Sequence, residues 1–158
     1  MKQRGFTLIE VLVAAAIFIF LSTLVSINLI SIEPRISLNE QVSVISSDIR
    51  KQQLLSMTGG SDNSATSDFG VYLENNKYTL FAGSSYSAGQ SKNIIVSLPT
   101  NTQITNITIP GSTIVFKKNL GEINNFVSGS NTFKVNNSIT NESKKITFNK
   151  LGIITAVQ

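Results

Sequence analysis

Gly5, Phe6 and Glu10 are the residues of this chain whose types and spacing could support chemistry. Glycine carries no side chain, so a peptidase could approach the backbone closely at Gly5. Cleavage after Gly5 would leave Phe6 with a new ammonium group, four residues before the Glu10 carboxylate. In an assembly of such chains, the Phe6 ammonium of one subunit could then neutralise the Glu10 carboxylate of the next.

The surroundings of Glu10 are apolar. It is the single charged residue in the segment 6–32, which contains neither Gly nor Pro. A helix rises about 1.5 Å per residue, so this segment is long enough to cross a hydrocarbon core. A carboxylate within such a helix costs about 3 kcal/mol on insertion scales and usually has a partner. Either Glu10 lies near the interface and reaches water, or it pairs within an assembly.

The segment from Gly5 to Glu10 reads Gly-Phe-Thr-Leu-Ile-Glu and follows the basic leader Lys2-Gln3-Arg4. Together with the apolar run, it resembles the class III signal of type IV prepilins and type II secretion pseudopilins. The resemblance implies cleavage after Gly5 by a prepilin peptidase, N-methylation of Phe6, and a role for Glu10 in assembly. It also implies the partners: other pilin or pseudopilin subunits, the peptidase and methyltransferase, an inner-membrane assembly platform and membrane lipid.

Positive charge flanks the apolar segment mainly on its N-terminal side. Lys2 and Arg4 precede it, whereas Arg35 beyond it is offset by Glu33. The positive-inside rule therefore predicts a single-pass protein of the cytoplasmic membrane, with its N-terminus inside and its C-terminal part outside. A conventional secretory signal is the alternative, but its apolar core would be shorter and Ala14-Ala15-Ala16 lies too early for its cleavage site. The resemblance adds a later location in a pilus or pseudopilus filament.

The remaining sequence contains little that could form a catalytic or metal site. It has no cysteine and no histidine, which removes disulfides, thiolate chemistry and the commonest general base. Glu74, Glu122 and Glu142 are scattered, and no nucleophile, base and orienting group can be assembled around them. Asp62 and Asp68 lack a third carboxylate and a recognised calcium-binding spacing. We therefore expect no enzyme activity, no cofactor and no metal.

Pro34 marks a boundary behind the apolar segment, since proline removes a helical hydrogen bond and disfavours helix at the residue before it. The next stretch still has a helical pattern. Its apolar residues recur at intervals of four, three and four, which places on one face Leu38, Val42, Ile45 and Ile49. Thr58-Gly59-Gly60 then predicts the end of the helix. We expect one long helix over about residues 6–57, kinked at Pro34; two helices with a hinge there are the alternative.

Beyond a polar loop at 59–67, the period of the apolar residues changes to two, as in strands. Turn residues separate the runs and no helical pattern intervenes, which favours an antiparallel sheet or sandwich. Asn75-Asn76 predicts a tight hairpin turn with positive φ. About eight strands are expected, at 69–74, 77–82, 93–98, 103–109, 112–118, 131–135, 145–149 and 153–157.

The expected fold class is therefore α+β, with a long N-terminal helix and an antiparallel β-rich head. Its parts are a leader at 1–5, a transmembrane and assembly helix at 6–32, an amphipathic helix packing on the head at 33–58, and an extracytoplasmic head at 59–158. Three segments are similar to the H-type minor pseudopilins, a group that includes pilus-initiating minor pilins: Ile49–Gln52, Phe69–Tyr72 with Tyr78–Phe81, and Ile146–Asn149 before Gly152. The absence of cysteine removes the disulfide loop of many major pilins and favours a minor subunit.

The head is basic, with eight lysines against three glutamates after Asp68 and a net charge of +5. Such an excess can attract DNA or other anionic surfaces. The candidates for DNA binding are the lysines that stand in pairs: Lys117, Lys118, Lys144 and Lys145. Lysines that protect solvated strand edges are the simpler interpretation. The leading function is a structural filament subunit, and the alternative is a competence-type minor pilin that captures DNA for uptake.

Overall fold

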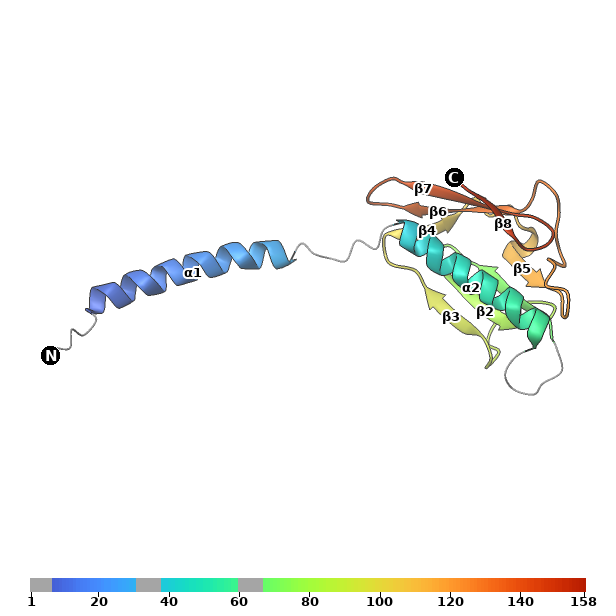
Figure 1. Ribbon diagram of the computed structural model, residues 1–158, viewed down its shortest axis with the longest axis horizontal. Coiled ribbons are helices and arrows are strands. Elements are labelled where there is room, and N and C mark those ends of the chain that lie inside the picture. The colour runs from blue at the N-terminus through green and yellow to red at the C-terminus, as the bar shows by residue number, and fades with distance from the viewer. Residues whose placement is uncertain (1–6, 31–37, 60–66) are drawn as a thin grey trace. The chain divides into compact units, whose positions relative to one another are not determined.

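The computed structural model describes residues 7–30, 38–59 and 67–158. The chain divides into two compact units, Met1–Ile36 and Ser37–Gln158, which are described separately. Both helices and most strands are labelled in Figure 1. The elements follow one another as α1 (Leu8–Ile30), α2 (Leu38–Thr58), β1 (Phe69–Leu73), β2 (Lys77–Ala82), β3 (Ile94–Ser97), β4 (Thr102–Thr105), β5 (Thr113–Phe116), β6 (Thr132–Asn137), β7 (Ser143–Phe148) and β8 (Ile154–Val157).

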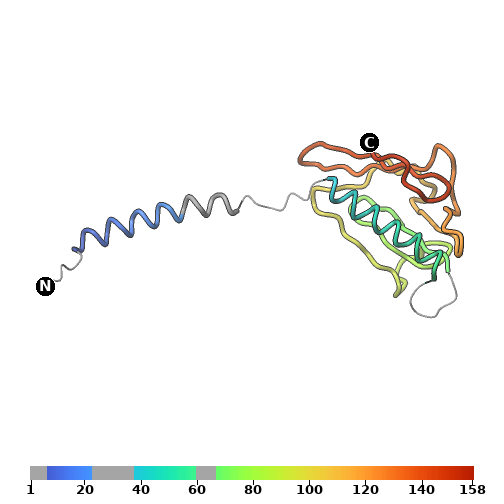
Figure 2. The backbone as a smooth tube through the Cα atoms, viewed as in Figure 1, coloured from blue at the N-terminus to red at the C-terminus, as the bar shows by residue number. Residues whose placement is uncertain are grey.

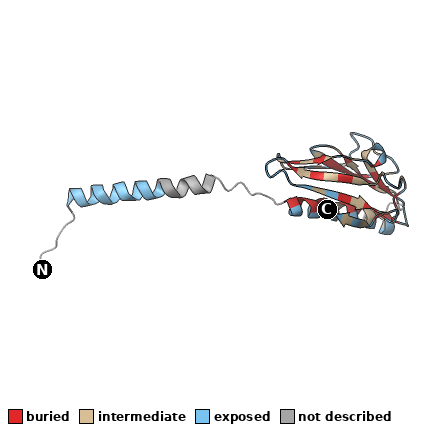
Figure 3. Cartoon of the chain, turned by 90° about the horizontal axis from the view of Figure 1, so that it is seen from above, coloured by how far each residue is buried: buried red, intermediate tan, exposed pale blue. Residues whose placement is uncertain are grey.

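Helix α1 belongs to the first unit and contains one charged residue, Glu10. Every side chain from Thr7 to Ser22 is exposed, including the large apolar Phe18 and Phe20, and this part is pale blue in Figure 3. A helix that is apolar on all sides needs lipid or other helices around it, because exposed apolar area is unfavourable in water.

Among the described residues, no helix is long and apolar enough to cross a membrane. Both ends of the predicted transmembrane segment 6–32 lie outside the described residues, so that segment stays a prediction. The same holds for the continuous helix expected over residues 6–57. Its junction at 31–37 lies outside the described residues, and α1 and α2 are described as separate helices.

The second unit, Ser37–Gln158, consists of helix α2 and two antiparallel four-stranded sheets, and is called the head from here on. Sheet A has the strand order β3-β2-β1-β5, and sheet B has the order β4-β6-β7-β8. Helix α2 contacts β1 and β5 in sheet A and β6 and β7 in sheet B, and the backbone trace in Figure 2 shows it running alongside both. This arrangement confirms the predicted α+β fold class with an antiparallel β-rich head.

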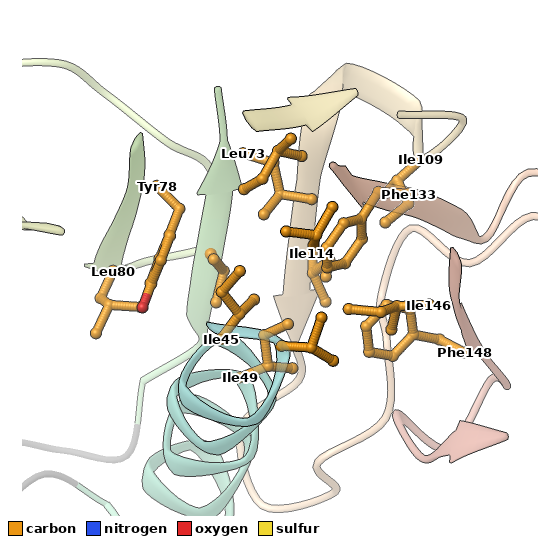
Figure 4. Packing of buried hydrophobic residues seen from close by; sticks show 14 of the residues in the cluster. Ile45, Ile49, Leu73, Tyr78, Leu80, Ile109, Ile114, Phe133, Ile146 and Phe148 are labelled. Atoms are coloured by element: carbon orange, nitrogen blue, oxygen red, sulfur yellow. The ribbon is translucent and has the colours of Figure 1, made fainter. Parts of the chain in front are cut away.

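The apolar core lies between α2 and the two sheets, as Figure 4 shows. Ile45 and Ile49 of the predicted helical stripe are fully buried, against strand residues such as Ile114, Phe133 and Phe148. Each fully buried side chain of this size stabilises the fold by about 1.5–3 kcal/mol. Every core residue in the described part of the chain belongs to the unit Ser37–Gln158. The head therefore has a complete core of its own and can fold without the first unit.

Helix α2 ends where the sequence predicts. Gly59 adopts φ 81°, and its N–H donates to the Leu55 carbonyl at 2.9 Å, which is the left-handed cap that glycine favours.

In the last two turns of α2, the Gln53 side chain forms hydrogen bonds to two turns of the head. Its Nε2 donates to the carbonyls of Gly121 at 2.9 Å and Leu151 at 2.7 Å. The C-terminal half of α2 is thus joined to both sheets by their connecting turns.

Two details of the strand prediction are wrong. The strand expected over 103–109 ends at Thr105, because Asn106 adopts φ 49° and interrupts the extended chain. The β1–β2 hairpin is present, but neither Asn75 nor Asn76 has a positive φ. Asn75 instead bonds to β4: its carbonyl accepts from Ile104 N–H at 2.8 Å, and its Nδ2 donates to the Ile104 carbonyl at 3.3 Å.

Candidate processing and assembly site

Thr7 and Glu10 form a reciprocal hydrogen-bonded pair at the start of helix α1. Glu10 Oε2 accepts hydrogen bonds from the Thr7 backbone N–H and from Thr7 Oγ1, each at 2.8 Å. In return, the Glu10 N–H donates to Thr7 Oγ1 at 3.4 Å. This is a capping box, in which a threonine at the N-cap and a glutamate three residues later satisfy N–H groups that the first turn leaves without partners.

The capping box gives Glu10 a partner within its own chain. Water or another subunit was the expected partner of this carboxylate, whereas the structure gives it Thr7 of the same chain. The signal was present, because Thr-x-x-Glu before an apolar run is the pattern of a capping box. Both bonds from Thr7 end on Oε2, and within residues 7–30, 38–59 and 67–158 the second oxygen, Oε1, has no bond of its own.

The residues expected to be cleaved and methylated, Gly5 and Phe6, lie outside the described residues. Their roles therefore stay predictions. The structure does describe where the helix begins: Leu8 is its first residue and Thr7 is its N-cap. The Gly5–Phe6 bond thus precedes the helix in sequence, and any chemistry on the Phe6 amine takes place one residue before the cap.

The four lysines considered for DNA binding belong to different sheets. Lys117 and Lys118 follow β5 of sheet A, whereas Lys144 and Lys145 lie within β7 of sheet B. Successive strand residues point to opposite faces, so even Lys144 and Lys145 do not share one. Lys145 is exposed opposite Lys134 of β6, and like charges in that position are unfavourable. The charge of the head is therefore spread over its surface.

The aspartates considered for calcium have other positions. Asp68 Oδ1 accepts a hydrogen bond from the Lys118 backbone N–H at 2.8 Å, and Asp62 lies outside the described residues. In residues 7–30, 38–59 and 67–158, no group of three or more His, Cys, Asp or Glu side chains could hold a metal ion. The carboxylate of Asp48 instead accepts from Tyr78 Oη at 2.6 Å, which ties α2 to β2.

A capped apolar helix followed by a β-rich head with one packed helix is a pilin-like architecture. Residues 1–26 match the family model described as the prokaryotic N-terminal methylation motif. The chain therefore carries the N-terminal motif of type IV pilins and type II secretion pseudopilins, which implies a precursor processed by prepilin peptidase. Members of that family are structural and non-enzymatic. Neither the comparison with curated proteins nor that with solved structures found a match.

Proposed function

We propose that this chain is a structural minor subunit of a type IV pilus or a type II secretion pseudopilus. One observation carries the proposal: the methylation motif coincides with a helix whose described side chains, Thr7 to Ser22, are all exposed. Such a helix requires lipid around it before assembly and neighbouring helices around it afterwards. A subunit that moves from membrane to filament meets both requirements.

The proposed order of events starts in the cytoplasmic membrane. Prepilin peptidase cleaves after Gly5, and the new amine of Phe6 is methylated; a methylated amine remains protonated. The subunit then joins other subunits through α1. Glu10 Oε1, which Thr7 leaves available, receives the Phe6 ammonium of a neighbouring subunit. The low dielectric between packed helices strengthens this attraction relative to water.

Two features favour a minor pseudopilin of the H type over a major pilin. The chain contains no cysteine, so it cannot form the disulfide loop of many major pilins. Its head has two four-stranded antiparallel sheets, which agrees with the β-rich head of that group. The alternative, DNA capture by a competence-type minor pilin, rests on the net charge of the head alone, since the paired lysines belong to separate sheets.

The test follows processing and incorporation in cells that contain an active prepilin peptidase and the filament subunits. Intact mass spectrometry of the wild-type chain should find a product that begins at methylated Phe6. Gly5→Val should accumulate as the precursor, because a side chain obstructs the close approach of the peptidase. Cells with an inactive peptidase are the control for cleavage. A wild-type chain that still begins at Met1 beside active peptidase, or that never co-purifies with filament subunits, would overturn the proposal.

A further inference from the structure

The two sheets of the head have four edge strands in the described residues, and three of these edges are covered or irregular. The edge of β4 is bonded to Asn75 through both backbone groups of Ile104. The edge of β5 is covered by Asn124, whose N–H donates to the Val115 carbonyl at 2.7 Å. Strand β8 carries a bulge or irregularity against β7. Covering segments and bulges are the means by which proteins prevent edge strands from pairing with other chains.

The fourth edge strand, β3 (Ile94–Ser97), has none of these features. It pairs with β2 in regular register, and the bond from Leu98 N–H to the Asn76 carbonyl at 2.9 Å continues the ladder. Bonding alternates along an antiparallel pair, so Ile95 and Ser97 direct their backbone groups away from β2. Figure 1 shows β3 at the outer side of its sheet, and within the described part of the head no strand pairs with that side.

Strand β3 is also apolar and uncharged. Ile94 and Ile95 are 57% and 61% exposed, and as successive strand residues they lie on opposite faces. The strand contains neither lysine nor proline, the residues that commonly protect edges. No acidic residue occurs between Glu74 and Glu122, and the nearest charge in sequence is Lys92. An occupant of this edge should therefore be an extended, apolar and uncharged strand.

We propose that the occupant is β3 of a second copy of this chain, paired antiparallel about a twofold axis at Ile95. In this register Ile95 lies opposite Ile95 of the second copy, Ile94 lies opposite Val96, and Asn93 lies opposite Ser97. Each pair joins residues of like polarity. The outward backbone groups also match. The N–H of each Ile95 donates to the carbonyl of the other Ile95, and the N–H of each Ser97 donates to the Asn93 carbonyl of the other copy. A twofold contact requires this kind of self-complementarity.

The charges are compatible with the pairing. Lys92 of each copy lies opposite Leu98 of the other, so the two lysines stand at opposite ends of the ribbon and do not meet. The contact covers exposed apolar area on both faces and joins the two A sheets into one continuous sheet. Because a twofold contact uses each β3 once, it closes and cannot propagate along a filament. The inference thus concerns a pair of heads, and it stands or falls independently of the proposed function.

Cysteine cross-linking tests the register directly, because the natural chain contains no cysteine. Ile95→Cys should form a disulfide-linked dimer under mild oxidation, since Cα atoms in a hydrogen-bonded pair are about 5.5 Å apart, within disulfide range. Asn93→Cys and Ser97→Cys should each fail alone, because like residues would be about 13 Å apart. A mixture of these two variants should cross-link. The full chain in detergent and the head fragment 37–158 should give the same pattern.

Sedimentation equilibrium of the head measures the affinity. The wild-type fragment should dimerise with rising concentration, and Ile95→Lys should raise the dissociation constant at least about tenfold, because two lysines would face each other. Leu120→Lys is the matched control, since Leu120 is 61% exposed and follows β5, the strand at the opposite edge of sheet A, and it should leave the dimer unchanged. Circular dichroism checks that each variant is folded. A monomeric wild-type head, or cross-linking with no preference among the three positions, would overturn the proposal.

Discussion

Replacing Glu10 by glutamine separates two roles of this residue, one in the helix cap and one in the proposed assembly. The amide oxygen of glutamine can accept the Thr7 hydrogen bonds, so Glu10→Gln retains the capping box. It cannot provide a counter-charge for the Phe6 ammonium of a neighbour. Glu10→Ala removes the cap and the charge together. The two variants therefore differ only in the cap.

The two roles differ in magnitude. Loss of a helix cap costs about 1 kcal/mol, or roughly fivefold in an equilibrium constant. Leaving one member of a buried charge pair without its partner costs about 3–5 kcal/mol, which is about 100-fold or more. Both Glu10 variants should therefore lose about 100-fold or more in incorporation, and alanine should be worse than glutamine by less than about tenfold. Insertion should improve, because the predicted membrane segment 6–32 would then contain no carboxylate.

The assay compares three quantities for each variant: the amount in the membrane, the N-terminal mass, and co-purification with filament subunits. Both Glu10 variants should be inserted and cleaved, since Glu10 lies beyond the Gly5–Phe6 bond in sequence, but they should be poorly incorporated. Thr7→Val is the matched control, because it removes the side-chain part of the cap and keeps the charge, and it should lose about fivefold or less. If Glu10→Gln incorporates as well as wild type while Thr7→Val fails, Glu10 acts through the cap and the ammonium pairing is wrong.

Four further outcomes are expected. Tyr78→Phe removes the 2.6 Å bond to Asp48 and should lower the free energy of unfolding in urea by about 1.5–3 kcal/mol. Burial and the Asp48 carboxylate raise the pKa of Tyr78 in the folded chain. Above about pH 10 the Tyr78 hydroxyl therefore loses its proton in the unfolded chain before it does in the folded chain, which favours unfolding. The free energy of unfolding of the wild type should fall more steeply with pH than that of Tyr78→Phe. Gly152→Ala should lower the melting temperature more than Gly89→Ala. Both glycines have positive φ, so the strain on the backbone is common to the two variants. A Cβ on Gly152 would also lie 2.6 Å from a Phe116 ring atom, whereas a Cβ on Gly89 would have no neighbour within 4 Å. Replacing the paired lysines Lys117, Lys118, Lys144 and Lys145 by glutamine removes half of the eight lysines after Asp68. If the charge acts diffusely, low-salt DNA binding, measured by fluorescence anisotropy, should weaken by the same factor as when the other four, Lys77, Lys92, Lys134 and Lys150, are replaced. A larger loss for the paired set, with about one salt-slope unit per lysine, would instead support phosphate contacts by the paired lysines.

The elements of the head could be predicted because local patterns dictate them. The spacing of Ile45 and Ile49 defines the buried face of α2, and both are fully buried. Alternation of apolar residues located all eight strands, with boundary errors of a few residues. Where a boundary was wrong by more, as at Asn106, one residue with positive φ ended a strand that hydropathy alone would continue. Hydropathy does not report such backbone conformations, and asparagine tolerates them without requiring them.

The pairing of the strands could not be predicted in the same way. Strands β1, β2 and β3 form a meander, but β4 then pairs in the other sheet, and β5 returns to pair with β1. The alternation of apolar and polar residues predicts which face of a strand is buried, but it does not predict which strands pair with it. The role of Asn75 illustrates the difference. Its sequence context indicates a turn, whereas its function, covering the edge of β4 at Ile104, depends on a strand about thirty residues away.

At the candidate site, the sequence motif from Gly5 to Glu10 could be identified from the residues alone. The hydrogen-bond partner of Glu10 was not predicted. Thr7 lies inside the motif that carries the resemblance, but a partner for Glu10 was expected only from water or another subunit. A local rule, the Thr-x-x-Glu capping box, would have found it. The lysine pairs illustrate the opposite error, since neighbours in sequence such as Lys144 and Lys145 point to opposite faces of a strand.

In the proposed assembly, the capping box would let one carboxylate serve the subunit both before and after it joins the filament. Before assembly, no ammonium from a neighbour is present, and the two Thr7 bonds together with the helix N-terminus stabilise the negative charge of Glu10. These bonds use Oε2 alone. An arriving ammonium can therefore bind Oε1 without displacing Thr7, so assembly would add a charge pair while the helix keeps its cap. If pairing had to break the cap first, about 1 kcal/mol of its attraction would be lost at every subunit.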